Sequence, residues 1–147
     1  MKSRLALALA LAVVVAWGSL EALATTASAP YLGTWTDRLS EAEMYDKGFD
    51  PQMAGPFRLI MRPNGTYTTL SPYADRLWVS RGTYTASGRR IVFANDVGCN
   101  DAGFTGKGVY AWALSKGQLR LVQPYFGSDP CGGRWQTLTY PVWKKKT

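Results

Sequence analysis

The sequence predicts an all-β protein: an eight-stranded antiparallel up-and-down β-barrel with one short helix in its first long loop. Short segments alternate apolar and polar residues, and tight-turn signals separate them. A glycine–any–aromatic triplet also recurs, beginning at Gly33, Gly65, Gly82 and Gly108. Residues two apart share one face of a strand, so each glycine lies on the face of its aromatic partner. A closed barrel is favoured because it leaves no open edge.

The alternation places eight strands along the chain. They cover residues 31–36, 57–62, 66–70, 79–85, 90–94, 108–114, 118–123 and 133–140. The faces that carry the aromatics are the apolar ones, so we expect them to look inward, with each glycine making room for a ring. The helix signal lies at 39–48, where Ser40 and Glu43 form a capping box and Gly48 a stop.

The two ends of this barrel are expected to differ. Tight turns fall at one end, at Asn64-Gly65, Ser87-Gly88 and Lys116-Gly117. Pro63 leaves the first turn open between two residues and three residues with a bulge, and the second turn pairs Tyr84 with Ile91. The long connections, near 37–56, 71–78, 95–107 and 124–132, fall at the other end. Loops on a rigid scaffold usually carry function, so we expect the site there, with the helix as its lid.

The first 24 residues have the pattern of a secretory signal peptide. Lys2 and Arg4 precede an apolar run over 5–17, and the small residues of a cleavage site stand at 22–24, with a second candidate at 27–29. A retained transmembrane anchor is not expected, because about 13 apolar residues fall short of the roughly 20 that span a bilayer. The predicted organisation is a signal peptide, 1–24, and a single barrel domain, 25–147. The protein is therefore expected to be secreted, periplasmic or at the cell envelope.

The chain contains two cysteines and no histidine. In an exported protein, Cys99 and Cys131 are expected to form a disulfide between two of the long loops. The lack of histidine excludes a Ser-His-Asp or Cys-His site and a zinc site of the usual kind. We expect no catalytic residue, no metal and no cofactor. The oxygens of Asn95, Asp96, Asn100 and Asp101 lack EF-hand spacing for calcium.

Charge is divided along the chain. Without Lys2, Arg4 and Glu21 the net charge changes from +7 to +6. The remaining carboxylates all fall in the long loops and are expected to be solvated: Asp37, Glu41, Glu43, Asp46, Asp50, Asp75, Asp96, Asp101 and Asp129. The strands and tight turns carry arginines, which either orient partners or simply solubilise the outer face. Nucleic acid is not an expected partner, because export and the acidic loop end argue against it.

Two motifs resemble a known family. Gly33-Thr34-Trp35 resembles the Gly-x-Trp signature of the lipocalins and the wider calycin group, which includes the avidins. The pattern C…GxYxW…L…L…DPCxxR, from Cys99 to Arg134, resembles the second half of small secreted lipocalin-like proteins of bacteria. This resemblance covers most of residues 31–143. It implies a buried Trp35 with a basic residue of the last strand over it, and Arg134 matches that residue best, with Lys144 second.

The same resemblance implies a function in binding. Calycin barrels typically bind small, mostly apolar molecules, and some inhibit proteases. The chain is shorter than typical lipocalins, lacks a clear Thr-Asp-Tyr segment, and has no evident C-terminal helix, so the identity of a ligand does not transfer. An eight-stranded barrel is just wide enough either to fill itself or to hold one small ligand.

Two functions from different classes remain. The first is binding of a small hydrophobic or amphipathic molecule in the barrel mouth, where an acidic rim favours neutral or cationic molecules. The expected ligand-binding residues are Tyr84, Phe93, Tyr110, Trp112, Trp78, Phe49, Met44 and Tyr125. The second is a protein-binding module, such as a secreted inhibitor or an envelope-associated factor, that uses the loop end of a filled barrel. A barrel enzyme is the third interpretation.

Overall fold

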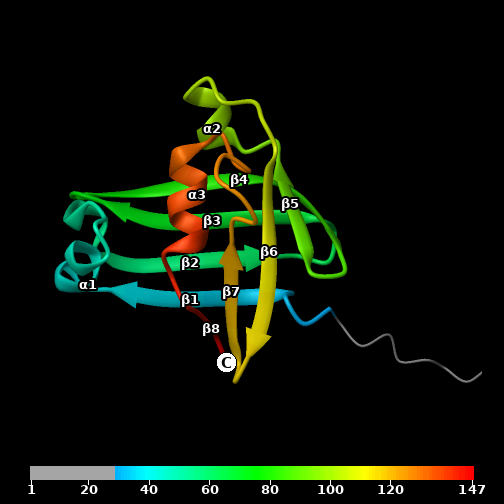
Figure 1. Cartoon of the computed structure of the whole chain (residues 1–147), viewed down its shortest axis with the longest axis horizontal. Coiled ribbons are helices and arrows are strands. Elements are labelled where there is room, and N and C mark those ends of the chain that lie inside the picture. The colour runs from blue at the N-terminus through cyan, green and yellow to red at the C-terminus, as the bar shows by residue number, and fades with distance from the viewer. Residues whose placement is uncertain (1–28) are drawn as a thin grey trace, which may run out of the picture.

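The computed structural model describes residues 29–147 and contains a closed eight-stranded barrel (Figure 1). Each strand pairs with the next in sequence, β8 returns to β1, and every pair is antiparallel. The predicted fold class is confirmed. The predicted signal peptide, 1–24, lies outside the described residues.

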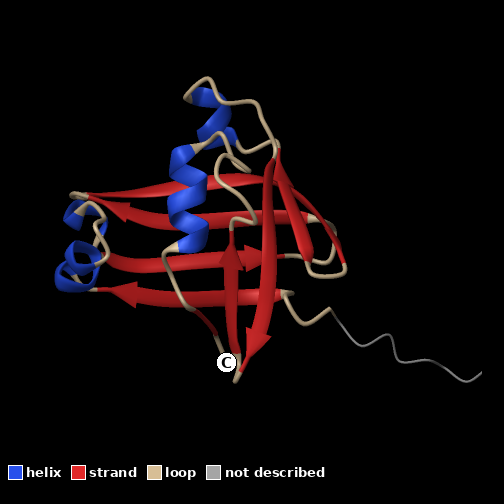
Figure 2. Cartoon of the chain, in the orientation of Figure 1, coloured by secondary structure: helices blue, strands red, loops and turns tan. Residues whose placement is uncertain are grey.

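Strands are the main regular structure of the described chain, with short helices in the connections (Figure 2). In chain order the elements are β1 (Gly33–Leu39), α1 (Glu41–Asp46), the 3₁₀ helix η1 (Pro51–Met53), β2 (Gly55–Met61), β3 (Thr66–Tyr73), β4 (Arg76–Ser87), β5 (Arg90–Ala94), α2 (Val97–Asp101), β6 (Gly108–Ser115), β7 (Gln118–Val122), α3 (Gly132–Thr139) and β8 (Trp143–Lys145).

The three expected tight turns exist, and two differ in detail. Lys116-Gly117 is the turn between β6 and β7, since Ser115 pairs with Gln118. The β2–β3 turn has three residues, because the Arg62 N–H donates to the Thr66 carbonyl at 3.0 Å. The β4–β5 turn lies one residue later than predicted, so Tyr84 pairs with Phe93 instead of Ile91. Pairing shifts by two residues when a turn shifts by one, and the same side chains therefore stay inward.

The connection predicted as a long loop at 71–78 is a tight hairpin. Tyr73 pairs with Arg76, and only Ala74 and Asp75 join β3 to β4. The β-favouring run Leu77–Val79 continues the strand, and Ala74 takes the positive φ of 53° that the turn requires. The loop end thus carries three long connections and one projecting hairpin, whose Ala74 N–H donates to the Gln52 carbonyl at 2.7 Å.

The segment 133–140, predicted as the eighth strand, is the helix α3. Its buried residues Arg134, Thr137 and Leu138 stand three and four positions apart, the spacing of one helix face. The eighth strand is instead β8, only three residues long, in which Lys145 pairs with Trp35 and Trp143 with Leu119. Because polar and apolar residues mix in 133–140, the segment can be taken for the two-residue alternation of a strand, and the strand prediction is wrong.

Aromatic rings fill the barrel interior. Phe93 meets Tyr67 edge-on with ring centres 4.8 Å apart and Tyr110 at 5.5 Å. A side chain on Gly82 would stand 2.7 Å from the ring of Tyr67, and one on Gly108 would collide with Asp129. These two glycines therefore make room for inward groups, as the triplet pattern predicts, although Gly82 accommodates a ring from a neighbouring strand.

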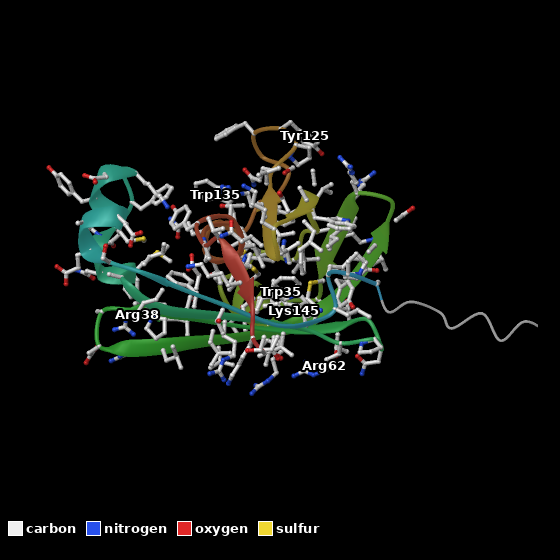
Figure 3. The ribbon with its side chains drawn as sticks, turned by 90° about the horizontal axis from the view of Figure 1, so that it is seen from below. Trp35, Arg38, Arg62, Tyr125, Trp135 and Lys145 are labelled. Carbon is white, nitrogen blue, oxygen red and sulfur yellow. A yellow bond between two sulfur atoms is a disulfide. The ribbon has the colours of Figure 1, made fainter. Side chains whose placement is uncertain are left out.

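The basic residue over Trp35 is Lys145, neither Arg134 nor Lys144. The Lys145 ammonium lies 5.4 Å from the centre of the Trp35 ring (Figure 3). Arg134 lies on α3 and pairs with Asp129, while Lys144 faces outward and pairs with Asp37 at 3.5 Å. Because β8 begins ten residues later than the strand predicted at 133–140, the residue brought across from Trp35 is a different one.

Candidate functional site

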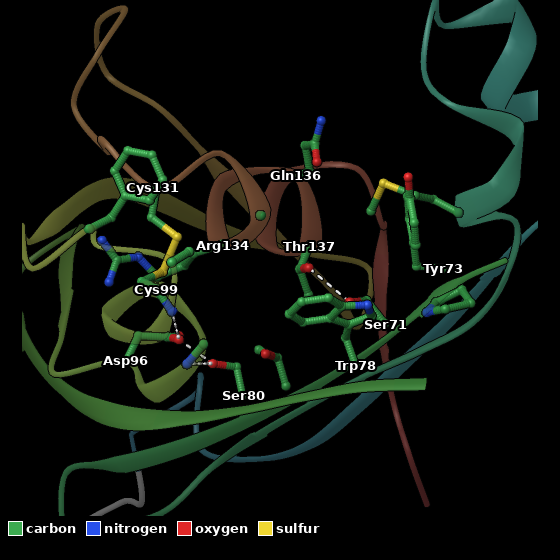
Figure 4. A pocket seen from close by; sticks show the side chains of 17 residues that line it. Ser71, Tyr73, Trp78, Ser80, Asp96, Cys99, Cys131, Arg134, Gln136 and Thr137 are labelled. Carbon is green, nitrogen blue, oxygen red and sulfur yellow. Dashed lines mark hydrogen bonds between the residues drawn. A yellow bond between two sulfur atoms is a disulfide. The ribbon is translucent and has the colours of Figure 1, made fainter. Parts of the chain in front are cut away.

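The loop end contains a cavity of about 280 Å³ between α3, α2 and the β3–β4 hairpin (Figure 4). It lies beside the filled interior, under α3, because the inward faces of β3 and β4 continue past the barrel and there meet the helix. Thr137 of α3 donates its hydroxyl to Ser71 of β3 at 3.1 Å, which fixes the helix against the strand. The helices that border the cavity are thus α2 and α3, whereas the helix predicted as a lid, α1, contributes no lining residue.

The cavity has an apolar wall and a row of hydroxyl groups. Trp78 and Tyr73 stand at its mouth with 57% and 44% of their surface exposed. Its hydroxyl groups come from two strands and one helix: Thr69, Ser71, Ser80 and Thr137. This mixture of aromatic surface and oriented polar groups is what a pocket for an amphipathic small molecule contains.

The disulfide closes one end of the cavity. Cys99 and Cys131 are bonded to each other, and both line the cavity. The bond joins α2 to the segment that enters α3, so the expected disulfide is confirmed. Its loop of 32 residues contributes about 3–4 kcal/mol to stability in the chain-entropy account.

Two buried carboxylates lie beside the disulfide, one on each side. Asp96 accepts from the hydroxyls of Tyr67 and Ser80 and from the Cys99 N–H at 3.0 Å. It caps α2, and only 2% of its surface is exposed. The expectation of solvated loop carboxylates is therefore wrong for Asp96.

Asp129 is the second buried carboxylate and holds Arg134. It accepts from the Arg134 Nε and Nη2 groups at 2.7 Å each, from the Tyr110 hydroxyl, and from the Cys131 N–H at 2.8 Å. Arg134 Nη2 also donates to the Gly106 carbonyl at 2.9 Å. With 7% of its surface exposed, Asp129 is likewise not a solvated rim carboxylate. The bidentate pair fixes α3 to the loops around it.

Burial and these carboxylates shift the pKa values of their partners. Burial, followed by the charge of Asp96, raises the pKa of Tyr67 far above its ordinary value of 10.0. Burial and then Asp129 do the same to the pKa of Tyr110. For Arg134, burial lowers the pKa, but the hydrogen bonds and charge of Asp129 outweigh burial and raise it. Both phenols are therefore hydrogen-bond donors that keep their protons in the folded protein.

These phenols predict an alkaline loss of stability. Since the folded pKa values lie above the unfolded value of 10.0, the stabilisation is complete below pH 10 and falls as the pH rises beyond it. Each tyrosine costs about 1.4 kcal/mol per pH unit there. Urea unfolding between pH 8 and 11 should show this slope, and Tyr67→Phe should reduce it. The phenolate absorbance that develops before unfolding should be unchanged in Tyr67→Phe, and a decrease would contradict the prediction.

The eight residues expected to bind a ligand do not share one cavity. Phe93, Tyr110 and Tyr84 pack together in the barrel core, and Met44 is also fully buried. Trp112 is part-buried at the tight-turn end, where its indole N–H donates to the Gly88 carbonyl at 3.0 Å. The other three lie at the loop end: Phe49 stacks on Tyr140, Tyr125 is 62% exposed, and Trp78 lines the cavity.

Sequence reasoning missed most of the cavity. Gln136 and Thr137 were assigned to a strand, so nothing placed them opposite the hairpin. One signal was available: Asp96 stands three residues before Cys99, the spacing of a helix cap.

The described residues contain no group of three or more His, Cys, Asp or Glu side chains that could hold a metal ion. Within 29–147, no helix is both long and apolar enough to cross a membrane.

Strand order and closure define the class of this fold as an eight-stranded up-and-down antiparallel barrel, an architecture that includes the lipocalins and streptavidin. Two solved structures are similar in part. A lipocalin-like protein from Bacteroides uniformis aligns with a TM-score of 0.42 and 19% identity over 67% of this chain and 93% of its own. The lipoprotein YedD from Klebsiella pneumoniae aligns with a TM-score of 0.41 and 14% identity over 74% and 84%. No protein-family model and no curated protein sequence matches the chain.

Proposed function

We propose that the protein binds a small amphipathic molecule in the cavity between α3 and the β3–β4 hairpin. The observation that carries this proposal is the cavity itself, whose volume of about 280 Å³ lies at the small end of ligand pockets. Its aromatic mouth offers surface to an apolar body, and its hydroxyl groups offer hydrogen bonds. The proposal keeps the expected function and moves the site from the aromatic barrel interior to the space under α3.

The charges near the cavity favour a neutral or cationic ligand. Asp96 and Asp129 accompany a single guanidinium, that of Arg134, which Asp129 already engages through two hydrogen bonds. The charge of Arg134 is therefore compensated, which disfavours a fatty-acid carboxylate, although the buried Arg134 Nη1 group has no hydrogen-bond partner among the described residues. This supports the expected preference, although the carboxylates are internal and do not form a rim.

We also propose that the protein acts outside the cytoplasm. The charged and apolar pattern of the first 24 residues supports export, and a disulfide is typical of an oxidising compartment.

Two exposed aromatics of the loop end provide a matched test. Trp78 lines the cavity and is 57% exposed, while Tyr125 lies outside it and is 62% exposed. The purified protein is titrated with the neutral probe N-phenylnaphthylamine and the anionic probe anilinonaphthalene sulfonate, following probe fluorescence. We expect the neutral probe to bind more tightly and Trp78→Ala to weaken it about tenfold, as loss of an aromatic contact of 1.4 kcal/mol does.

The control separates this site from its alternatives. Tyr125→Ala should leave binding unchanged. Binding that ignores Trp78→Ala but falls in Tyr84→Phe or Trp112→Phe would place the site in the barrel core or at the tight-turn end and contradict the proposal. Tighter binding of the anionic probe than of the neutral probe would contradict the proposed charge preference.

A protein partner at the loop end is the second candidate. The observation that favours it is Phe126, which is fully exposed beside Tyr125 on the segment between β7 and α3. Exposed aromatic anchors of this kind are common at interfaces. Phe126→Ser should abolish the binding of such a partner, and it should leave the cavity intact because Phe126 does not line it.

A further inference from the structure

Five cations share the outer face of the sheet formed by β8, β1, β2, β3 and β4. Thr36 pairs with both Arg58 and Lys144, so these two lie on either side of the same outward residue. The whole set, called the basic face below, is Arg38, Arg58, Arg62, Arg81 and Lys144. Figure 3 shows Arg38 and Arg62 on the same side of the barrel, opposite Tyr125.

Apolar side chains lie between these cations. A groove of about 400 Å³ on the basic face has Pro56, Leu70 and Leu77 among its lining residues, with Arg38, Arg58 and Lys144 around them. Leu77 is 53% exposed, and its neighbour on the same face, Val79, is 42% exposed. The surface therefore combines cationic and apolar groups. Arginines that only solubilise the outer face would not account for the exposed apolar side chains between them.

Protein carboxylates leave most of this charge free. Asp37 is the one carboxylate lining the groove; its side chain is 7% exposed, and it accepts from the Val142 N–H at 2.8 Å and pairs with Lys144. Among the described residues, none of the four arginines of the basic face forms an ion pair. Other carboxylates lie on α1, at Glu41, Glu43 and Asp46, and in the β3–β4 turn, at Asp75.

We propose that the basic face docks onto an anionic lipid bilayer. Phosphate groups would meet the arginines, while Leu77 and Val79 would reach the boundary between headgroups and acyl chains. A soluble polyanion complements the charge but gains nothing from the exposed leucine and valine. The inference does not depend on the cavity under α3, because the two sites lie on opposite faces of β3 and β4.

The test is co-sedimentation of the purified protein with vesicles of phosphatidylcholine alone and of phosphatidylcholine mixed with phosphatidylglycerol. We expect binding only to the anionic vesicles, and less of it as salt is raised. Arg58→Gln with Arg81→Gln should lower the partition constant about 25-fold, at about fivefold per cation. Leu77→Ser with Val79→Ser should also lower it.

A second pair of arginines supplies a control of equal charge. Arg90 and Arg120 are exposed on the outer faces of β5 and β7, outside the basic face. Arg90→Gln with Arg120→Gln should leave vesicle binding within about threefold of the unsubstituted protein if docking uses one face. Equal losses in both double variants would overturn the proposal in favour of net charge. Absence of vesicle binding, or binding to soluble polyphosphate in its place, would overturn it as well.

Discussion

Arg134→Met is expected to lower the free energy of unfolding by about 3–5 kcal/mol, because it leaves Asp129 buried without its cation. The side chains of Arg134 and Asp129 are 1% and 0% exposed, and two hydrogen bonds of 2.7 Å join them. The contact to the Gly106 carbonyl is lost at the same time. Methionine keeps much of the side-chain volume, so the cost arises from charge and hydrogen bonding rather than from a cavity.

Urea unfolding of the disulfide-intact protein at neutral pH measures this effect. Lys144→Met is the control, since it removes a cation from an ion pair whose lysine is 64% exposed, and it should cost at most about 1 kcal/mol. If Arg134→Met cost no more than Lys144→Met, the buried pair would contribute nothing particular to stability. Arg134→Met combined with Asp129→Leu should cost less than the sum of the two single changes, since no unpaired charge remains.

The same pair organises the cavity. Arg134 lies on α3, Asp129 precedes the helix, and Asp129 also receives the N–H of Cys131, which is bonded to Cys99 of α2. One carboxylate therefore connects the helix, the disulfide and, through the Tyr110 hydroxyl, the barrel core. A variant that breaks this pair is expected to weaken probe binding in addition to lowering stability.

Local patterns predicted the elements whose signals are local. The capping box at Ser40 forms as expected, with the Glu43 N–H donating to the serine hydroxyl at 3.2 Å and the Glu43 carboxylate accepting from the Ser40 N–H at 2.8 Å. The two turn residues Lys116 and Gly117 are enough to fix the pairing of β6 with β7, in which Ser115 lies opposite Gln118. Period-two alternation was enough for the strands that have one face in the core.

The parts that were missed depend on contacts distant in sequence. Ser71 and Thr137 are 66 residues apart, and only a helical 133–140 brings them together. The burial of Asp96 is compensated by hydrogen bonds that Tyr67 of β3 and Ser80 of β4 donate to its carboxylate. A single sequence does not show which distant side chains will donate hydrogen bonds to Asp96 and Asp129, so from sequence alone both carboxylates are expected to be solvated. The error at α3 then displaced the last strand and with it the residue expected over Trp35.

Trp35→Ala is expected to lower the free energy of unfolding by about 3–5 kcal/mol, as removal of a buried aromatic side chain does. Trp35 is 1% exposed, lies in β1 between β2 and β8, and donates its indole N–H to the Tyr31 carbonyl at 2.9 Å. The change would leave a cavity at the tight-turn end, where β8 is only three residues long and pairs with β1 through Trp35 and Thr36. Closure of the barrel is therefore the feature that this substitution should weaken most.

Comparison with Lys145→Ala separates the ring from the cation above it. The ammonium lies 5.4 Å from the ring centre, but Lys145 is an exposed residue, so its cation–π contribution should be about 0.5–1 kcal/mol. Trp35→Phe should fall between the two, since it keeps an aromatic ring but loses volume and the hydrogen bond to Tyr31. A urea midpoint for Trp35→Ala no lower than that of Lys145→Ala would mean that the tryptophan does not hold the short strand β8 in place. The barrel closure would then depend on Trp143, which is fully buried on β8 itself and pairs with Leu119.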